Sequence, residues 1–485
     1  MIDLIFNLRN DRPQLVNSAF LIENIDQLQS GIFSDREIDY IQHQIENNKK
    51  FISLNYYYHW NYIIVTPTNS CKNDRLEELR KIGAIVAVHI KKHEVNFVNV
   101  VDNLNDYQLP LAFIEGLALA SYSFKKYKTE KPKGQKFGRI NLFSQNITQK
   151  NLEHLESVIT AVYKTRDLVN EPASYLTAEK LADEAVQIAK NATIEVEVFH
   201  KEKLQKIKMG GLLAVNQGST EPPTLTKMEW KPTNALNEKP IVLIGKGVVY
   251  DSGGLSLKPT ENSMDEMKCD MAGAAAVINT MDLLANTQAP YHVIALIPAT
   301  DNRLSANSYA PGDVVTMYDG QTVEVMNTDA EGRMILADAL SYAKQFDPEL
   351  TITVATLTGS AVRAIGERAS VFMGNAPQET MLKLVESANR THERTVQFPF
   401  WDDYAEELKS DVADMKNIGS NLGGSITAGK FLEKFAPKNF IHIDIAGTAF
   451  YTKEREYYPI GGTGYGVRLL VDFINNYNNK KTIAE

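Results

Sequence analysis

Short strand-like runs recur along the second part of the chain, with helix-like stretches between them. Two of these runs, 241–244 and 293–297, are apolar throughout, which is typical of strands buried on both faces. The runs lie at 195–199, 241–244, 293–297, 351–355 and 441–445. Because strands that alternate with helices form a sheet covered on both faces, the pattern predicts an α/β domain with a mixed, mostly parallel sheet flanked by helices.

The N-terminal part of the chain shows a second, shorter alternation. The runs at 62–65 and 84–88 are predicted as buried strands, and a charged helix is predicted between them over 74–81. The stretch 109–124 is apolar on nearly all sides, which indicates a well-buried helix. This part is therefore predicted to form a smaller α/β domain of its own.

A long amphipathic helix is predicted to join the two domains. From Thr148 onward, apolar residues recur three or four positions apart, and Pro172 ends the pattern. The predicted organisation is an N-terminal α/β domain over 1–147, a linking helix over 148–172 and a larger C-terminal domain over 173–485.

The composition is that of an ordinary globular protein, with 44% hydrophobic and 23% charged residues in a chain of 485. The formal net charge is −9, which argues against a general nucleic-acid-binding surface. The lysine-rich segment 128–136 is accordingly interpreted as a solvated loop. We expect no nucleic acid as a regular partner.

Cysteine content and hydropathy favour a cytoplasmic protein. The two cysteines, Cys71 and Cys269, are too few for a disulfide framework, so a reducing compartment is expected. No apolar stretch approaches the length of a membrane span, and the first residues lack the basic start of a signal peptide. No membrane association is predicted.

The heptapeptide at 327–333, NTDAEGR, concentrates charge after an extended apolar run. Asp329, Glu331 and Arg333 alternate along it, so an extended backbone would direct all three side chains to one side. Left unpaired, two carboxylates and a guanidinium would cost stability. They therefore indicate an ion-paired turn, a helix N-terminus that favours acids, or a ligand site.

A second charged segment follows the run at 241–244 and reads KGVVYDSGGLSLKP over 246–259. Its glycines permit tight turns or close approach to a ligand, and it contains no phosphate-binding pattern. Lys246, Asp251, Lys258 and the later Asp270 all fall beside the ends of predicted strands. In open α/β sheets, functional sites collect at such ends.

Together the two segments offer an oxygen-rich set of side chains. Carboxylates without histidine suit one or two divalent ions of magnesium, manganese or zinc, and a pair of ions could activate a bridging water. Cys269 is a single thiol within the second segment and is interpreted as incidental. Neither segment contains a histidine, and no GxSxG pattern occurs, so nothing indicates a serine hydrolase.

These segments resemble the signatures of the leucine aminopeptidase (cytosolic aminopeptidase) family of dinuclear zinc exopeptidases. Further matches to that family are RDLVNEPA at 166–173, TLTG at 356–359, DMKN at 414–417, DIAGTA at 444–449 and GYGVR at 464–468. The resemblance covers roughly residues 160–475. It assigns the domain over 173–485 as a metallopeptidase catalytic domain.

The resemblance implies a role for particular residues of this chain. The implied ligands of a tightly held metal are Lys246, Asp251, Asp270 and Glu331, and those of a more exchangeable metal are Asp251, Asp329 and Glu331. Lys258 would stabilise the reacting oxygen, and Arg333 would hold a bicarbonate that acts as general base. The implied substrate-binding residues are Met267, Thr356, Leu357, Gly359 and Ala446.

The chain departs from the family pattern between Lys258 and Asp270, where it is one residue longer. Asp270 rather than Cys269 is the implied ligand only if the extra residue is absorbed in the turn around 261–263. We expect that turn to absorb it, because the small-residue helix after Met271 then keeps its relation to the ligand.

The implied activity is that of a leucyl aminopeptidase, a hydrolase that removes leucine-like residues from peptides with a free N-terminus. Its implied cofactors are two divalent ions per chain, zinc or manganese, whose bridging hydroxide attacks the peptide. A homohexamer is the implied assembly. The alternatives are a narrow dipeptidase, such as a cysteinylglycine hydrolase, and a moonlighting DNA-binding protein on the same scaffold.

Overall fold

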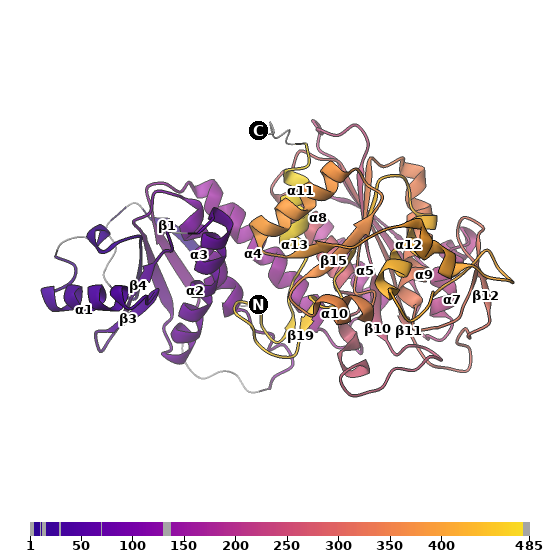
Figure 1. The fold of residues 1–485 in the computed structure, drawn as a ribbon, viewed down its shortest axis with the longest axis horizontal. Coiled ribbons are helices and arrows are strands. Elements are labelled where there is room, and N and C mark those ends of the chain that lie inside the picture. Colours follow the sequence, from indigo (N-terminus) through magenta and orange to yellow (C-terminus); the bar gives the residue numbers. More distant parts are fainter. Residues whose placement is uncertain are drawn as a thin grey trace. The chain divides into compact units, whose positions relative to one another are not determined.

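The computed structural model describes residues 4–9, 11, 16–28, 31–68, 70–129 and 137–478. The chain divides into two compact units (Figure 1). The small unit comprises Met1–Tyr163 and Thr452–Ile460, and the large unit comprises Lys164–Tyr451 and Gly461–Glu485. Most of the lysine-rich segment, residues 130–136, lies outside the described residues. None of the described helices is both long and apolar enough to cross a membrane.

The small unit is built on one sheet with the strand order β1-β6-β5-β2-β4-β3. Its neighbouring strands run parallel except for the β3–β4 pair, which is an antiparallel hairpin. The strands are β1 (Ile5–Arg9), β2 (Ser18–Ile22), β3 (Phe51–Asn55), β4 (Trp60–Val65), β5 (Phe97–Asp102) and β6 (Arg139–Phe143). The helices are α1 (Asp35–Glu46), α2 (Lys72–Lys92), α3 (Gln108–Ser121) and the first part of α4 (Gln149–Asn170), which continues into the large unit from Lys164.

The prediction of a strand over 84–88 is wrong, because these residues continue α2. Within the run, Val86 and Ala87 are buried, whereas Ile85 and Val88 are 50% and 63% exposed. This spacing of buried and exposed positions belongs to a helix, although the bare apolar run is equally typical of a strand. The strand at 62–65, the buried helix near 109–124 and the long helix from Thr148 are confirmed as β4, α3 and α4.

Tyr457 belongs to the small unit although it lies late in the chain. Its ring is fully buried, and its hydroxyl donates to the carboxylate of Glu77 on α2, with O–O distances of 3.0 and 3.1 Å. Arg80 on the same helix donates to Glu115 on α3 over 2.7 Å. The segment Thr452–Ile460 is thus fixed to α2 by a buried polar contact.

The large unit contains a mixed sheet with the strand order β16-β15-β18-β14-β9-β11-β8-β7, and β10 pairs with β11. The central strands β18, β14, β9, β11 and β10 are parallel, as predicted. The strands are β7 (Glu195–Phe199), β8 (Thr224–Trp230), β9 (Ile241–Gly245), β10 (Gly247–Asp251), β11 (Val293–Asn302), β14 (Leu350–Ala355), β15 (Ser370–Gly374), β16 (Thr395–Gln397) and β18 (Phe440–Asp444). All five predicted runs are confirmed as strands.

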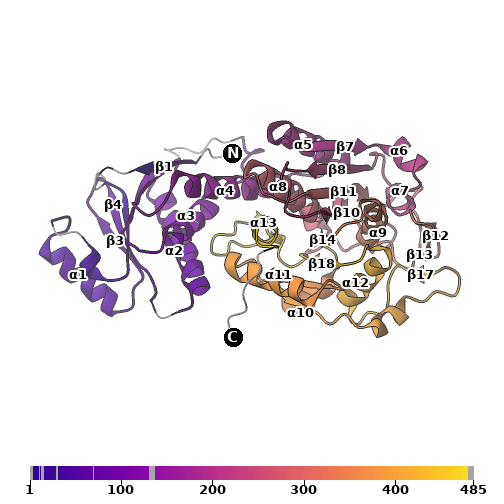
Figure 2. The same cartoon turned by 90° about the horizontal axis from the view of Figure 1, so that it is seen from above.

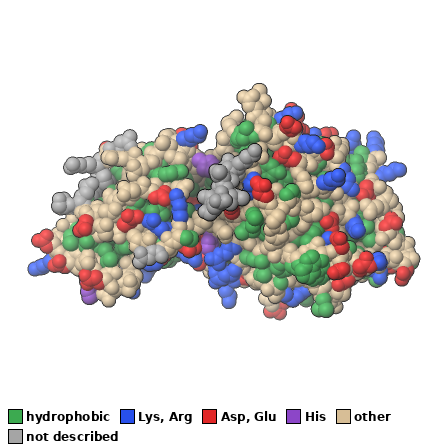
Figure 3. Space-filling model, turned by 45° about the horizontal axis from the view of Figure 1, so that its top comes forward, with side chains coloured by type: hydrophobic (Ala, Val, Ile, Leu, Met, Phe, Trp, Pro, Cys, Tyr) green, Lys and Arg blue, Asp and Glu red, His purple; other side chains and the backbone are tan. Residues whose placement is uncertain are grey.

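Helices cover both faces of this sheet, so the predicted α/β fold class is confirmed (Figure 2). One face carries α5 (Ala178–Ala192), α8 (Ala272–Asn286) and α13 (Val467–Asn475), and the other carries α7 (Gly210–Asn216), α9 (Glu331–Ala343) and α12 (Gly424–Phe435). Val242 and Ile244 of β9 belong to the buried core beneath α9 and α12. Acidic and basic side chains are both spread over the face of the large unit drawn in Figure 3.

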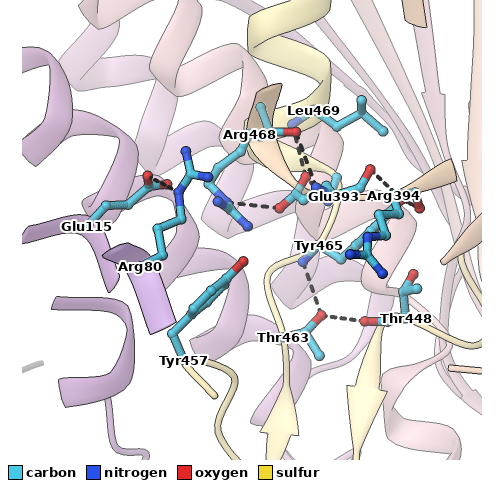
Figure 4. Close-up of polar contacts among 12 residues, drawn as sticks. Arg80, Glu115, Glu393, Arg394, Thr448, Tyr457, Thr463, Tyr465, Arg468 and Leu469 are labelled. Atoms are coloured by element: carbon cyan, nitrogen blue, oxygen red, sulfur yellow. Dashed lines mark hydrogen bonds and ion pairs between the residues drawn. The ribbon is translucent and has the colours of Figure 1, made fainter. Parts of the chain in front are cut away.

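Helix α13 is anchored by the buried carboxylate of Glu393, which precedes β16. This carboxylate accepts hydrogen bonds from the amides of Gly466 and Leu469 over 2.9 Å and from Nε of Arg468 over 3.2 Å (Figure 4). The arrangement satisfies amides at the start of the helix that have no partner within it. Gly466 has a φ of +100°, a backbone conformation that favours glycine.

Candidate metal centre

The carboxyl ends of β9, β14 and β18 meet at one edge of the sheet, because the three neighbouring strands are parallel. Lys246 follows β9 and is 3% exposed. Its Nζ lies 2.8 Å from Oδ1 of Asp270 and 2.8 Å from Oε1 of Glu331. Burial alone would lower the pKa of Lys246, but the surrounding carboxylates outweigh it and raise that pKa above its usual value.

Asp251 ends β10 and is oriented by hydrogen bonds to one of its oxygens. Its Oδ1 accepts from the Gly253 amide and from Nδ2 of Asn302, both over 2.8 Å. Its Oδ2 lies 3.0 Å from Nζ of Lys258, and that lysine also forms an ion pair with Asp329. Burial and the neighbouring Glu331 raise the pKa of Asp251 to about 7.

The heptapeptide at 327–333 is a turn followed by a helix, so of the backbone courses considered the extended one does not occur. Asp329 lies in the turn, and α9 begins at Glu331. The helix N-terminus weighed as an alternative therefore describes the local structure, and its free amides favour a carboxylate. Burial would raise the pKa of Glu331, but Lys246 and Lys258 lower it.

The turn is joined to the second segment by the amide of Asn302. This side chain donates to Oδ1 of Asp251 and to the carbonyl of Thr328 over 2.9 Å, and it is fully buried. The hydroxyl of Tyr309 donates to the same carbonyl over 3.0 Å. Asn302 therefore fixes Asp251 relative to the residue that precedes Asp329.

Gly332 allows the start of α9 to pass close to Lys246. A Cβ at this position would lie 2.5 Å from Cε and 2.6 Å from Nζ of Lys246. Because Lys246 is buried, a side chain at position 332 would push the lysine away from the carboxylates of Glu331 and Asp270. Glycine is therefore favoured at position 332 because a larger residue would clash with Lys246.

The donor set fits a divalent metal. One carboxylate oxygen from each of Asp251, Asp329 and Glu331 lies within 4.8 Å of the others. Asp270 adjoins this group through Lys246, and its buried Oδ2 accepts no hydrogen bond from the residues that the structure describes. A buried carboxylate oxygen without a donor is costly, whereas a cation beside it would offset that cost.

Arg333 lies in the first turn of α9, two residues after Glu331, and is buried. Its Nη1 donates to the carbonyl of Asn417 over 2.7 Å, and its buried Nε has no hydrogen-bond partner among the described residues. Burial lowers the pKa of Arg333 to about 10. A guanidinium with an unused donor suits a small oxyanion.

Residues 163–471 match the model of the cytosol aminopeptidase family, catalytic domain. The chain belongs to this family. A protein named "Probable cytosol aminopeptidase" from Syntrophotalea carbinolica is 45% identical over 372 residues, covering 74% of each chain. Another of that name from Phytoplasma australiense is 42% identical over 394 residues, covering 80% of this chain and 79% of the relative. The resemblance seen in the sequence is confirmed, and the protein is an aminopeptidase, a hydrolase of a metal-dependent family.

Solved structures share the fold of this aminopeptidase over nearly its whole length. A mutant of tomato leucine aminopeptidase matches with a TM-score of 0.84 and 25% identity, covering 98% of this chain and 96% of its own. The bottromycin maturation enzyme BotP in complex with Mn matches with a TM-score of 0.83 and 26% identity, covering 95% and 99% of the two chains.

The residues expected to bind substrate in this aminopeptidase lie in the segment after β14, in the segment after β18 and in a short 3₁₀ helix. Thr356 and Leu357 follow β14, and Oγ1 of Thr356 donates to Oδ1 of Asp270 over 2.8 Å. Ala446 follows the neighbouring strand β18. Gly359 is exposed at the start of α10 (Gly359–Ile365), and Met267 is half-buried in the 3₁₀ helix η2 (Met264–Cys269).

Three polar residues that support the site were not singled out from the sequence. Asn417 accepts from the Met326 amide over 2.8 Å and donates to the Asn327 carbonyl over 2.7 Å. Asn302 and Asp444 bridge separate segments in a similar way. Asn417 and Asp444 stand inside family-like motifs, which was the available signal, whereas Asn302 is marked only by its place at the end of β11.

Proposed function

We propose that this aminopeptidase uses two divalent metal ions, zinc or manganese, to release leucine-like residues from the N-termini of peptides. The observation that carries the proposal is that one lysine and four carboxylates from separate segments come together at one site. Some of their buried oxygens have no hydrogen-bond partner among the described residues. The proposed ligands are Lys246, Asp251, Asp270, Asp329 and Glu331. The Mn in the related BotP structure supports a divalent ion.

The proposed division of ligands follows the contacts. Lys246 and Asp270 would serve one ion and Asp329 the other, while Asp251 and Glu331 would serve both. Lys246 is held as an ammonium by its carboxylate neighbours. It would become a ligand as the neutral amine, because metal binding displaces the proton.

Ions bound at this position would supply an activated water and would polarise the carbonyl of the scissile peptide. Lys258 is 15% exposed and pairs with Asp251 and Asp329, and in the proposed mechanism its Nζ would donate a hydrogen bond to the oxygen that becomes negative. Arg333 has the unused Nε needed to hold a bicarbonate as general base. A free amine can bind a metal whereas an internal amide cannot, which explains exopeptidase specificity.

The experiment that tests the proposed function is a panel of aminoacyl amides and dipeptides assayed with zinc and with manganese. We expect leucine amide to exceed glycine amide by about 10–200-fold in kcat/KM, because added apolar groups in a pocket contribute on this scale. Cleavage restricted to cysteinylglycine would favour the dipeptidase alternative. Absence of turnover with every substrate and either metal would refute the proposal.

Separate substitutions of the neighbouring residues Cys269 and Asp270 test which of the two is the metal ligand. Cys269→Ser is expected to keep metal and activity, whereas Asp270→Asn should lose at least the tightly bound ion. The carboxylate of Asp270 contacts Lys246 and Thr356 at the site. Asn262, in the exposed turn proposed to absorb the extra residue, has a φ of +56°. Metal content by plasma mass spectrometry measures both variants, and the reverse result would shift the register by one residue.

We further propose a cytoplasmic homohexamer. The relatives' name supports the location, and the family resemblance supports the assembly. Light scattering coupled to size exclusion at micromolar concentration is expected to give a mass six times that of the chain. A monomeric mass under those conditions would contradict this prediction.

A further inference from the structure

Asp444 ends β18 directly beside Ala355, the last residue of β14. Its side chain is buried and reaches across to the loop that follows the neighbouring strand. Its Oδ1 accepts from the Leu357 amide over 3.1 Å and from the Ala446 amide over 3.2 Å. A single carboxylate oxygen therefore joins the two loops that leave this edge of the sheet.

The second oxygen of Asp444 extends the same arrangement to α10. Its Oδ2 accepts from Oγ1 of Thr358 over 2.7 Å, and that hydroxyl in turn caps α10 by accepting from the Ala361 amide over 3.1 Å. Because α10 begins at Gly359, its first turn is also positioned through Asp444. Three backbone segments thus depend on one buried carboxylate.

Burying a carboxylate is costly, and burial does raise the pKa of Asp444 while its hydrogen bonds act against this. The cost is offset only while all the donors converge on it. Removing the side chain would leave the amides of Leu357 and Ala446 without their acceptor and would free the two loops to separate.

We propose that Asp444 is a positioning residue that sets the selectivity of this aminopeptidase for the N-terminal side chain. The inference rests on the proposed function, which places Leu357, Gly359 and Ala446 in the substrate pocket. These are the three residues whose backbone Asp444 fixes, directly or through Thr358. The metal ligands lie on other segments, so Asp444 governs the shape of the pocket rather than metal binding.

Two substitutions separate the hydrogen bonds of Asp444 from its charge. Asp444→Asn keeps Oδ1 as acceptor for both amides, and its Nδ2 can donate to Thr358. The ratio of kcat/KM for leucine amide to that for alanine amide is therefore expected to stay within about threefold of the parent value. Asp444→Ala removes both acceptors, and the ratio is expected to fall at least about tenfold, chiefly through a higher KM for leucine amide.

Ser425→Ala is the matched control, because this buried hydroxyl contacts Asp444 only at 3.5 Å and holds no pocket loop. It should leave the selectivity ratio unchanged. Metal content is measured in every variant and is expected to match the parent. A uniform loss of rate with an unchanged ratio in Asp444→Ala would overturn the inference.

If Asp444→Ala does not fold, Thr358→Val provides the decisive measurement, since it removes the hydroxyl that joins Asp444 to the first turn of α10. An unchanged ratio in that variant would equally overturn the inference. A parent enzyme that prefers another residue would refute the leucine preference alone, because the ratio between its best and poorest substrates would still test Asp444.

Discussion

Replacing Glu331 with alanine is expected to abolish aminopeptidase activity and to reduce the bound metal. Glu331 is 1% exposed at the first position of α9, and its Oε1 lies 2.8 Å from Nζ of Lys246. In the proposed site its carboxylate serves both ions. Its removal would also leave the buried charge of Lys246 with one carboxylate fewer, which lowers the stability of the folded protein.

Metal content by plasma mass spectrometry and turnover of leucine amide measure this effect. Asp251→Ala should behave in the same way, because Asp251 is the other carboxylate proposed to serve both ions. Asp319→Ala is the control, since this acid contacts Ser341 and Lys344 away from the site and should leave both quantities unchanged. Two metals per chain with near-normal turnover in Glu331→Ala would refute the ligand assignment.

Lys258→Ala and Arg333→Ala are expected to keep the metal and to lose turnover by about 10²–10³-fold, the scale typical of electrostatic groups that stabilise a transition state. Lys258 lies at the open side of the carboxylates, 15% exposed, where a substrate oxygen can reach it. Arg333 donates to Asn417 and keeps Nε for an anion. The loss should appear in kcat more than in KM, because the interactions form in the transition state.

Lys246→Ala provides the contrast, with weakened metal binding as its main effect. This lysine is enclosed between Asp270 and Glu331 and has no access to substrate. The two lysines therefore differ in which quantity falls first, metal content or turnover. Loss of metal in Lys258→Ala would show that Lys258 holds the carboxylates together rather than acting on substrate.

Strands β9 and β11 were predictable because they are buried on both faces and their runs at 241–244 and 293–297 are apolar. Val242 and Ile244 face the core under α9, while Ile241 and Leu243 are buried on the opposite face. The run at 84–88 shows where this argument fails. Whether Ile85 and Val88 face solvent depends on what packs against α2, and a short apolar run does not indicate which residues pack there.

The site was predictable only as far as its motifs extended. Lys246, Asp251, Asp270 and Glu331 were identified from two segments and come together in the structure. The course of the backbone at 327–333 was not, because three alternating charges fit an extended chain and a helix start alike. Asn302 was not identified because its role is to hydrogen-bond Asp251 and Thr328, two residues that are far apart in the sequence.

Because the late segment Thr452–Ile460 belongs to the small unit, the two units cannot be separated by a single cut in the chain. A fragment that begins at Lys164 would retain the whole catalytic sheet, yet it would expose the ring of Tyr457, deprived of Glu77. The late segment leaves and returns through a hairpin in which Tyr451 pairs with Gly461. A two-residue Asn-Gly turn between those positions would close the hairpin and permit the large unit to be produced alone.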